Sequence, residues 1–235
     1  MAGGRVTPER PILLLTRPEA GSRAFLEALT ERGVTGVTAI VSPLFDYEAV
    51  EHALVEPGAD LIFTSGEAVR HAGPGAGRLA WCVGDHTART AAAAGFVTRN
   101  AGGDANDLIA LIRSAKPERK LVHFRGEVSA ADICGALSVA GLNCSDRIVY
   151  RKIPKPLAED ADAALMGKTP VLLPLFSPET ATLLVDQGPF AAPITVCALS
   201  ENVAHASVPL DPVEMKISAK PDLATMVRLV AGLIA

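Results

Sequence analysis

Short apolar runs alternate along the chain with longer stretches of helical character. The runs are too short for helices and have no polar face, which is typical of buried parallel strands. They are residues 12–16, 61–64, 80–83, 121–124, 170–176 and 194–199. The predicted helices are residues 20–32, 67–71, 87–94, 106–114, 129–140, 178–186, 201–206 and 223–233. Strand, tight turn and helix in repetition predict an α/β protein with doubly wound parallel sheets.

The two halves of the chain share sequence blocks in the same order. Arg17 follows a strand in the first half as Arg125 does in the second, and Gly33 and Gly141 end the helices that come next. Three matches in series indicate a duplicated unit about half the chain long. The matched blocks are residues 13–19 with 121–127, 63–68 with 175–180, and 82–88 with 198–204.

Two further apolar runs, residues 37–41 and 147–152, fall outside this rhythm. Each follows the helix of an Arg-bearing block and precedes a segment with proline, residues 42–43 or 153–156. Proline suits linkers because it cannot donate a backbone hydrogen bond. The chain is therefore predicted to change domain at both points.

The composition excludes several classes of protein. Of the 235 residues, 49% are hydrophobic and 4% aromatic, and the net charge of −4 makes a nucleic-acid-binding basic face improbable. Mean hydropathy is +0.29, yet no apolar stretch approaches the ~20 residues that cross a bilayer. Residues 1–10 lack the pattern of a signal peptide. We expect a cytoplasmic protein, with residues 1–10 as a flexible leader and without membrane or nucleic-acid partners.

The cysteines and histidines show no metal-ligand spacing. Cys82, Cys134, Cys144 and Cys197 form no C-x-x-C pair, and all four are predicted to be reduced and buried. The five histidines stand singly, and none is predicted to bind a metal. The nucleotide motif G-x-x-x-x-G-K-[ST] and the hydrolase motif G-x-S-x-G are both missing. We therefore predict neither a metal nor a nucleotide, and no other cofactor.

Polar side chains gather where the predicted strands end. The carboxyl ends of parallel strands form one edge of a sheet, and α/β proteins bind ligands at that edge. Each of these turns also opens a helix, whose free N–H groups and dipole favour an anion. Any one residue could merely cap its helix, but the set predicts a site for a ligand with several carboxylates or phosphates. The residues are Thr16, Arg17, Thr64, Ser65, Gly84, Asp85, Arg125, Gly126, Ser177 and Ser200.

In order and spacing, these blocks resemble the uroporphyrinogen-III synthase family. The resemblance extends from about residue 11 to residue 235 and rests on short motifs that are specific only together. They are Leu15-Thr16-Arg17-Pro18, Phe63-Thr64-Ser65, Val83-Gly84-Asp85-His86-Thr87-Ala88, Gly102-Gly103-Asp104, Arg125-Gly126-Glu127, Val149-Tyr150-Arg151 and Phe176-Ser177-Pro178.

The resemblance implies two flavodoxin-like domains, each with a doubly wound parallel sheet, and an active site in the cleft between them. The first domain would combine residues 11–36 with 154–235, and the second would comprise residues 43–146. Residues 37–42 and 147–153 would pair as a two-stranded antiparallel linker. Two connections of this kind permit hinge motion.

The reaction that the resemblance implies is a cyclisation without a cofactor. Linear hydroxymethylbilane loses its hydroxyl as water and closes to uroporphyrinogen III, while ring D inverts through a spiro intermediate. Unassisted closure gives the uninverted isomer, so the enzyme, expected to be a monomer, must chiefly hold one conformation of its substrate. The side chains implied to bind the carboxylates are Thr16, Ser65, Thr87 and Ser177, helped by Arg17 or Arg125.

Tyr150, from the family's V-Y motif, is the catalytic candidate. It would donate a proton or a hydrogen bond to the leaving hydroxyl. A phenol with a pKa of about 10 is a weak acid at neutral pH, so its contribution should be about 10- to 100-fold. The alternative is that Tyr150 only packs at the hinge.

The second G-x-x-T-A block departs from the family pattern. Ser200 replaces the usual glycine and Val203 the usual threonine. Because valine cannot form a hydrogen bond through its side chain, this turn would bind mainly through backbone N–H groups. Gly84 and Thr87 keep the first block intact, so Thr87 is the stronger candidate.

Two other functions share these sequence features. A non-catalytic, two-lobed binding protein for a polyanionic small molecule would have the same fold and hinge but no need of Tyr150. A flavodoxin-like regulatory protein would need an acidic phosphoacceptor cluster, which the sequence lacks. The synthase is the interpretation that uses both the turns and Tyr150.

Overall fold

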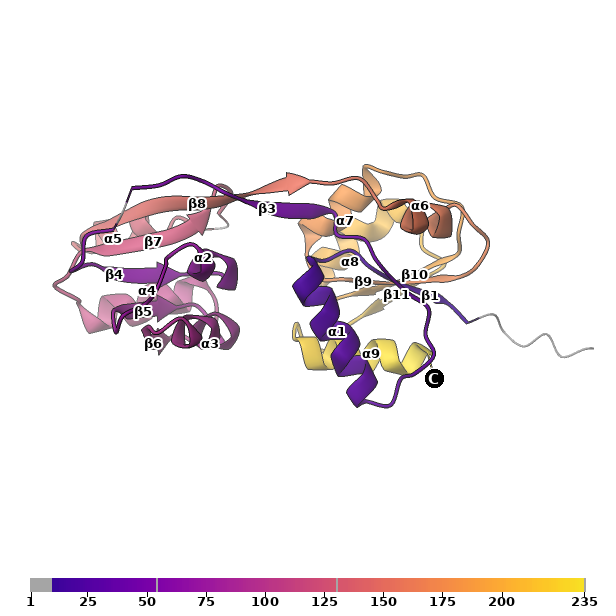
Figure 1. Ribbon diagram of the computed structural model, residues 1–235, viewed down its shortest axis with the longest axis horizontal. Helices are drawn as coiled ribbons and strands as arrows, with labels where there is room; N and C mark the ends of the chain where they lie inside the picture. The colour runs from indigo at the N-terminus through magenta and orange to yellow at the C-terminus, as the bar shows by residue number, and fades with distance from the viewer. Residues whose placement is uncertain (1–9, 54, 130, 235) are drawn as a thin grey trace, which may run out of the picture. The chain divides into compact units, whose positions relative to one another are not determined.

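The computed structural model describes residues 10–53, 55–129 and 131–234 (Figure 1). Except for Arg10, the leader predicted for residues 1–10 lies outside the described residues. The chain divides into two compact units: unit 1 holds the residues up to Asp46 and from Pro154 onward, and unit 2 is Tyr47–Ile153. Among the described helices, none is long and apolar enough to cross a bilayer.

The sheet of unit 1 consists of five parallel strands. They lie in the order β2 (Ala39–Val41), β1 (Ile12–Leu15), β9 (Val171–Leu175), β10 (Ile194–Ala198) and β11 (Glu214–Ile217). Numbered along the chain, this order is 2-1-3-4-5. The direction of winding therefore reverses between β1 and β9, and we call this point the switch point of unit 1.

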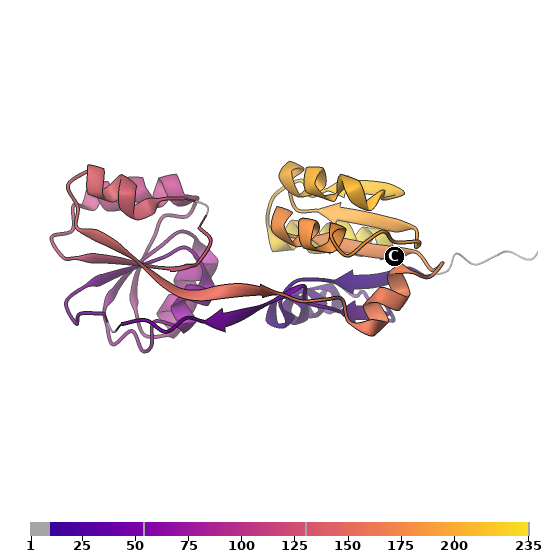
Figure 2. The same ribbon diagram turned by 90° about the horizontal axis from the view of Figure 1, so that it is seen from above.

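Helices cover both faces of this sheet (Figures 1 and 2). The strands bury alternate residues on the two faces. Leu13 and Leu15 point to the face with α1 and α9, whereas Leu14 points to the opposite face. The first face is covered by α1 (Glu19–Glu31) and α9 (Leu223–Ile234). The second face is covered by α6 (Glu159–Leu165), α7 (Pro178–Val185) and α8 (Glu201–Ser207). A 3-10 turn at Val208–Leu210 follows α8.

The sheet of unit 2 follows the same plan with a shifted start. Its parallel strands are β8 (Cys144–Pro154), β7 (Leu121–Gly126), β4 (Asp60–Phe63), β5 (Leu79–Cys82) and β6 (Val97–Asn100), and β3 (Phe45–Ala49) lies beside β8. Numbered from β4, the order is 3-2-1-4-5. The winding reverses between β4 and β7, the switch point of unit 2.

The helices of unit 2 also form two layers. Leu61 and Phe63 pack against α2 (Gly66–Arg70) and α3 (Asp85–Ala93), while Ile62 and Trp81 pack on the face of α4 (Ala105–Ala115) and α5 (Ile133–Val139). The predicted α/β class with parallel sheets is confirmed. So is the duplication, because β1 matches β7, β9 matches β4 and β10 matches β5 in their places in the two sheets.

The predicted helices and central strands are present, with small shifts at their ends. The predicted helix 129–140 begins only at Ile133, because Asp132 caps it: Oδ1 accepts a hydrogen bond from the Gly135 N–H at 2.8 Å. The edge strands β6 and β11 were not predicted, since most of their residues are partly or fully exposed and form no apolar run. Helix α6 was missed as well.

The pairing predicted for residues 37–42 with 147–153 is wrong. Strand β2 lies at the edge of the unit 1 sheet, where Ala39–Val41 pairs in parallel with Leu13–Leu15, and the neighbour of β8 is β3. The duplication supplies the reason. Strand β2 stands beside β1 as β8 stands beside β7, so each completes the sheet of its own repeat.

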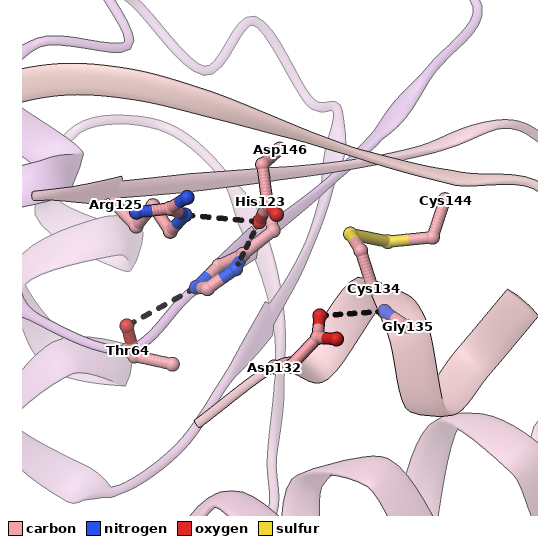
Figure 3. The surroundings of a disulfide bond; sticks show 8 residues. All are labelled: Thr64, His123, Arg125, Asp132, Cys134, Gly135, Cys144 and Asp146. Carbon is pink, nitrogen blue, oxygen red and sulfur yellow. Dashed lines mark hydrogen bonds and ion pairs between the residues drawn. A yellow bond between two sulfur atoms is a disulfide. The ribbon is translucent and has the colours of Figure 1, made fainter. Parts of the chain in front are cut away.

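The prediction that all four cysteines are reduced is also wrong. Cys134 and Cys144 form a disulfide, with their Cα atoms 5.1 Å apart (Figure 3). Cys82 and Cys197 are free and buried, as predicted. Burial raises the pKa of these two thiols to about 11 and about 12, which makes both poor nucleophiles.

Candidate functional site

Five of the predicted site residues line one pocket at the switch point of unit 2. Thr64 and Ser65 follow β4, Arg125 and Gly126 end β7, and Tyr150 lies on the adjacent strand β8. The pocket has a volume of about 210 Å³. Ligands of open α/β sheets bind at the carboxyl ends of the strands where the winding reverses. The structure therefore places these residues where the fold favours a ligand.

Gly126 allows Tyr150 to reach this pocket. A bulge between Arg125 and Gly126 brings Gly126 opposite Tyr150 in the register of β7 and β8. A Cβ atom on Gly126 would lie 2.7 Å from Cε2 of the Tyr150 ring, closer than van der Waals contact allows. Gly126 was predicted to bind substrate, and the structure gives it a second role as the gap into which the ring fits.

The Tyr150 side chain is held in one position. Its ring packs edge-on against Tyr47 and stacks on His71, with ring centroids 5.2 Å and 5.9 Å apart. Its hydroxyl lies 3.2 Å from Oγ of Ser65. Ser65 Oγ in turn accepts a hydrogen bond from the Ala68 N–H at 3.1 Å and so caps α2. The phenol oxygen is thereby fixed at the wall of the pocket.

A buried histidine, His123, lies behind the pocket and is not among the predicted site residues. His123 on β7 is fully buried; its Nδ1 lies 2.9 Å from Oδ1 of Asp146, and its Nε2 lies 3.2 Å from Oγ1 of Thr64 (Figure 3). Arg125 Nε pairs with the same carboxylate oxygen at 3.2 Å. Burial lowers the pKa of His123, although Asp146 opposes this. The sequence feature that could have identified His123 is its place as a polar residue within the otherwise apolar run of residues 121–124.

The remaining candidates of unit 2 lie outside this pocket. Gly84 is the N-cap residue that precedes α3, and its neighbour Val83 reaches the pocket wall. Thr87 is buried in the first turn of α3. Both are at the predicted edge of the sheet, but the structure does not bring them together with Tyr150.

The unit 1 candidates stand at the corresponding edge. Thr16 and Arg17 follow β1. Thr16 is buried, and its Oγ1 has no hydrogen-bond partner among the described residues. The guanidinium of Arg17 lies 4.0 Å from the centre of the Phe176 ring. Ser177 caps α7, its Oγ accepting from the Thr180 N–H at 3.1 Å.

Ser200 precedes α8 and forms no side-chain cap. Val203, the second departure from the family pattern, is buried in the apolar core of unit 1. The contribution of this turn to binding through backbone N–H groups stays a prediction.

A larger hollow of about 740 Å³ lies elsewhere in unit 2. It is lined by residues at the C-terminal ends of α4 and α5, among them Arg113, Lys116 and Gly141. In an α/β unit the helices run opposite to the strands, so these ends lie at the edge away from the switch point. The hollow contains none of the predicted site residues, and we do not assign the site to it.

One group of potential metal-binding atoms surrounds His123. Atoms of His123, Cys134 and Asp146 lie within 4.8 Å of one another. The Cys134 sulfur is bonded to Cys144, however, and a disulfide sulfur is not the thiolate that binds metals. The Asp146 carboxylate is already shared by His123 and Arg125. We assign no metal here, and the absence of a metal site stays a prediction.

The family model for uroporphyrinogen-III synthase HemD matches residues 23–227. The chain belongs to the uroporphyrinogen-III synthase family. The family consists of cofactor-free lyases of haem biosynthesis, and membership implies that the substrate is a small molecule, a tetrapyrrole. Among curated protein sequences, none matches the chain significantly.

Solved structures of other synthases have the same fold. The crystal structure of uroporphyrinogen-III synthetase from Helicobacter pylori superposes with a TM-score of 0.65 at 17% identity, over 95% of this chain and 99% of that one. A mutant uroporphyrinogen III synthase from the extremely thermophilic bacterium Thermus thermophilus gives a TM-score of 0.56 at 17% identity, over 95% and 98% of the two chains. At this identity the likeness concerns the fold.

Proposed function

We propose that the protein closes hydroxymethylbilane to uroporphyrinogen III, with loss of water and inversion of ring D through a spiro intermediate. The pocket at the switch point of unit 2 carries the proposal, because Tyr150 and four predicted substrate-binding residues line it together. A site made of hydroxyls, an arginine and a phenol suits a substrate that brings its own reactive pyrroles and many carboxylates.

The pocket is suited to part of the substrate. Its volume of about 210 Å³ is below the ~300–1,000 Å³ of pockets that enclose a whole drug-sized ligand. We infer that it receives one pyrrole ring with its side arms. The Arg125 guanidinium, held by Asp146 and by the Gly126 and Glu127 carbonyls, supplies a positive charge for a carboxylate.

Tyr150 assists the departure of the hydroxyl group. Ser65 Oγ accepts from the Ala68 N–H and lies 3.2 Å from the Tyr150 oxygen, and either hydroxyl can be the donor of this contact. We propose that Ser65 donates in the complex with substrate, which leaves the phenol proton for the leaving oxygen. The bond between carbon and the hydroxyl oxygen breaks with both electrons going to the oxygen, which takes up the phenol proton and leaves as water. The lone pair of the pyrrole nitrogen stabilises the resulting cation, and the Tyr150 phenolate regains a proton when the attacked ring carbon loses one after closure. The fixed ring position supports the proposal, since a general acid acts only within hydrogen-bond reach.

We propose that the two units are flavodoxin-like domains joined by an antiparallel pair of strands. The order 2-1-3-4-5 of unit 1 is that of flavodoxin, and unit 2 has the same order with a permuted start. The Val50 N–H donates to the Val149 carbonyl at 3.0 Å and the Lys155 N–H to the Leu44 carbonyl at 2.8 Å. As residue numbers rise along β3 they fall along β8, which supports the antiparallel pairing.

In unit 1, Thr16, Arg17, Ser177 and Ser200 are proposed to bind further carboxylates of the substrate, and Gly84 with Thr87 to do so in unit 2. Their support is their place at the carboxyl edges of the sheets. That the protein is a cytoplasmic monomer, with neither a nucleic-acid nor a membrane partner, stays a prediction.

An isomer assay tests the function. Fresh hydroxymethylbilane is incubated with and without the protein, the products are oxidised, and type I and type III porphyrins are separated. We expect type III to predominate with the protein and type I without it. Type I with the protein present would contradict the proposal. If the protein then bound hydroxymethylbilane, the alternative of a non-catalytic binding protein would replace the synthase.

A further inference from the structure

His123 connects the pocket to Asp146, a carboxylate that is not among the residues lining the pocket. The ring is fully buried between two polar partners, Asp146 Oδ1 at 2.9 Å and Thr64 Oγ1 at 3.2 Å. Of the three, only Thr64 lines the pocket. A buried polar ring costs free energy unless its nitrogens are hydrogen-bonded, and the proposed role of Tyr150 does not involve His123.

The partners determine which ring nitrogen carries the proton. An ionised carboxylate only accepts hydrogen bonds, so His123 Nδ1 must be the protonated nitrogen that donates to Asp146. The lowered pKa keeps the ring neutral at neutral pH, and Nε2 then has no proton. Nε2 can only accept a hydrogen bond, and its partner is the hydroxyl of Thr64.

The hydroxyl of Thr64 is therefore oriented. Its single proton points to His123, and its oxygen offers lone pairs to the pocket. An oxygen in this state accepts hydrogen bonds and repels a carboxylate. Thr64 is predicted from its turn to bind an anion, but this orientation of its hydroxyl favours a hydrogen-bond donor of the substrate instead.

We propose that His123 and Asp146 are positioning residues that hold the Thr64 oxygen as a hydrogen-bond acceptor for an N–H or O–H group of the substrate. The inference rests on the proposed function and deepens it. The groups of hydroxymethylbilane that fit are a pyrrole N–H and the hydroxymethyl O–H. Arg125 shares the carboxylate of Asp146, so one acid places both the acceptor and a cation of the pocket.

The arrangement reverses when His123 is protonated. Nε2 then becomes a donor, and Thr64 must accept from it and turn its own proton toward the pocket. The charged groups facing the ring among the described residues are Asp146 on β8 and Arg125 on β7; Cys134 on α5 is nearby but does not titrate because it is in the disulfide. Acid should therefore lower kcat/KM. Asp146→Asn removes the charge that favours the imidazolium form of His123. The fall of kcat/KM on the acid side of its pH profile, which we call the acid limb, should therefore move to lower pH.

A double-mutant cycle in the full-length enzyme tests the coupling. Thr64→Val removes the hydroxyl at constant shape, and His123→Phe removes both ring nitrogens. Each should lower kcat/KM by about 10- to 100-fold, as expected for an unpaired polar group in a site. The double variant should be no worse than Thr64→Val alone. His123→Gln, whose amide oxygen can replace Nε2 as the acceptor, should recover most of the loss. His205→Gln, on the exposed face of α8, is the control.

Losses that multiply in the double variant would overturn the proposal, and so would a kcat/KM of Thr64→Ser as low as that of Thr64→Val. If His123→Phe does not fold, His123→Gln and the pH shift of Asp146→Asn still decide: an unmoved acid limb contradicts the proposal. The wild-type isomer assay tests the function separately. NMR of the His123 ring needs no activity, and a proton on Nε2 at neutral pH would refute the orientation of Thr64.

Discussion

The switch points of the two units come from the same duplicated blocks but are built differently. In unit 2, Arg125 pairs with Asp146 beside a pocket of about 210 Å³ that Tyr150 lines. In unit 1, its counterpart Arg17 lies on the Phe176 ring. A Cβ at Gly21 would be 2.6 Å from Arg17 Nε, so the absence of a side chain there accommodates this packing. The duplication gives the two switch points the same backbone arrangement. Individual side chains then determine which functional groups each switch point offers.

The two units can also be compared at one pair of helix caps, Ser65 and Ser177. Ser65 and Ser177 have nearly equal backbone angles, φ −147° and ψ 150° against φ −148° and ψ 149°, and each accepts from an N–H three residues on at 3.1 Å. Their second partners differ. Ser65 Oγ contacts the Tyr150 hydroxyl, whereas Ser177 Oγ contacts Oγ1 of Thr180 at 2.8 Å. The cap is structural in both units, and of the two serines only Ser65 also contacts a tyrosine hydroxyl.

The largest effect is expected from filling the gap under Tyr150. Gly126→Ala places a methyl group 2.7 Å from a ring that Tyr47 and His71 hold in place, so the phenol must move. A displacement of about 1 Å in a site can reduce the rate about 100-fold, and we expect kcat/KM to fall by that amount. Gly58→Ala, where a Cβ meets nothing within 4 Å, is the matched control. Equal activities of the two variants would show that the ring position is unimportant.

Removal of the phenol hydroxyl should have a smaller effect. Tyr150→Phe keeps the packing and loses the hydrogen bond to Ser65. We expect kcat to fall about 10- to 100-fold, the range of a modest general acid. Steady-state kinetics measures this, with thermal unfolding as the check on folding. Full turnover by Tyr150→Phe would leave the tyrosine a packing role only.

The disulfide is expected to affect the stability of unit 2 more than the activity of the protein. It spans 10 residues between α5 and β8 of unit 2, whereas both described cysteines outside it, Cys82 and Cys197, are free. For a loop of that length, the reduced protein or the variant with Cys134→Ser and Cys144→Ser should lose about 2–3 kcal/mol of unfolding free energy. Urea unfolding with and without dithiothreitol measures the loss, and hydrogen exchange should place it in unit 2. Identical urea curves would contradict the bond.

The sequence predicts the central strands better than the edges. Buried runs such as Ile12–Leu15 and Val171–Leu175 are apolar because both faces are covered by helices. The edge strand Val97–Asn100 has no such run, since its residues are exposed or half-buried. Residues 37–42 were predicted as a linker because they fall outside the alternation of strands and helices and end at a proline. In the structure, Ala39–Val41 is an edge strand whose residues are half-buried or exposed.

Candidate residues could be predicted where they follow a strand at a turn. They could not be predicted where two residues meet only because of the register between neighbouring strands. Thr64 and Arg125 follow predicted strands, and their place at the edge follows from the fold. His123 and Asp146 are 23 residues apart and meet because they are opposite one another on β7 and β8. Cys134 and Cys144 meet in the same region. No local pattern encodes such pairs, since the alignment of the two strands brings them together.

The most direct test compares Ser65→Ala with Ser177→Ala. Both variants lose the same cap, so each should lose about 1 kcal/mol of stability. If the chemistry takes place at the switch point of unit 2, Ser65→Ala should lower kcat about tenfold by releasing the Tyr150 hydroxyl. Ser177→Ala should leave kcat essentially unchanged and raise KM. Equal losses of kcat in the two variants would contradict the assignment of the chemistry to unit 2.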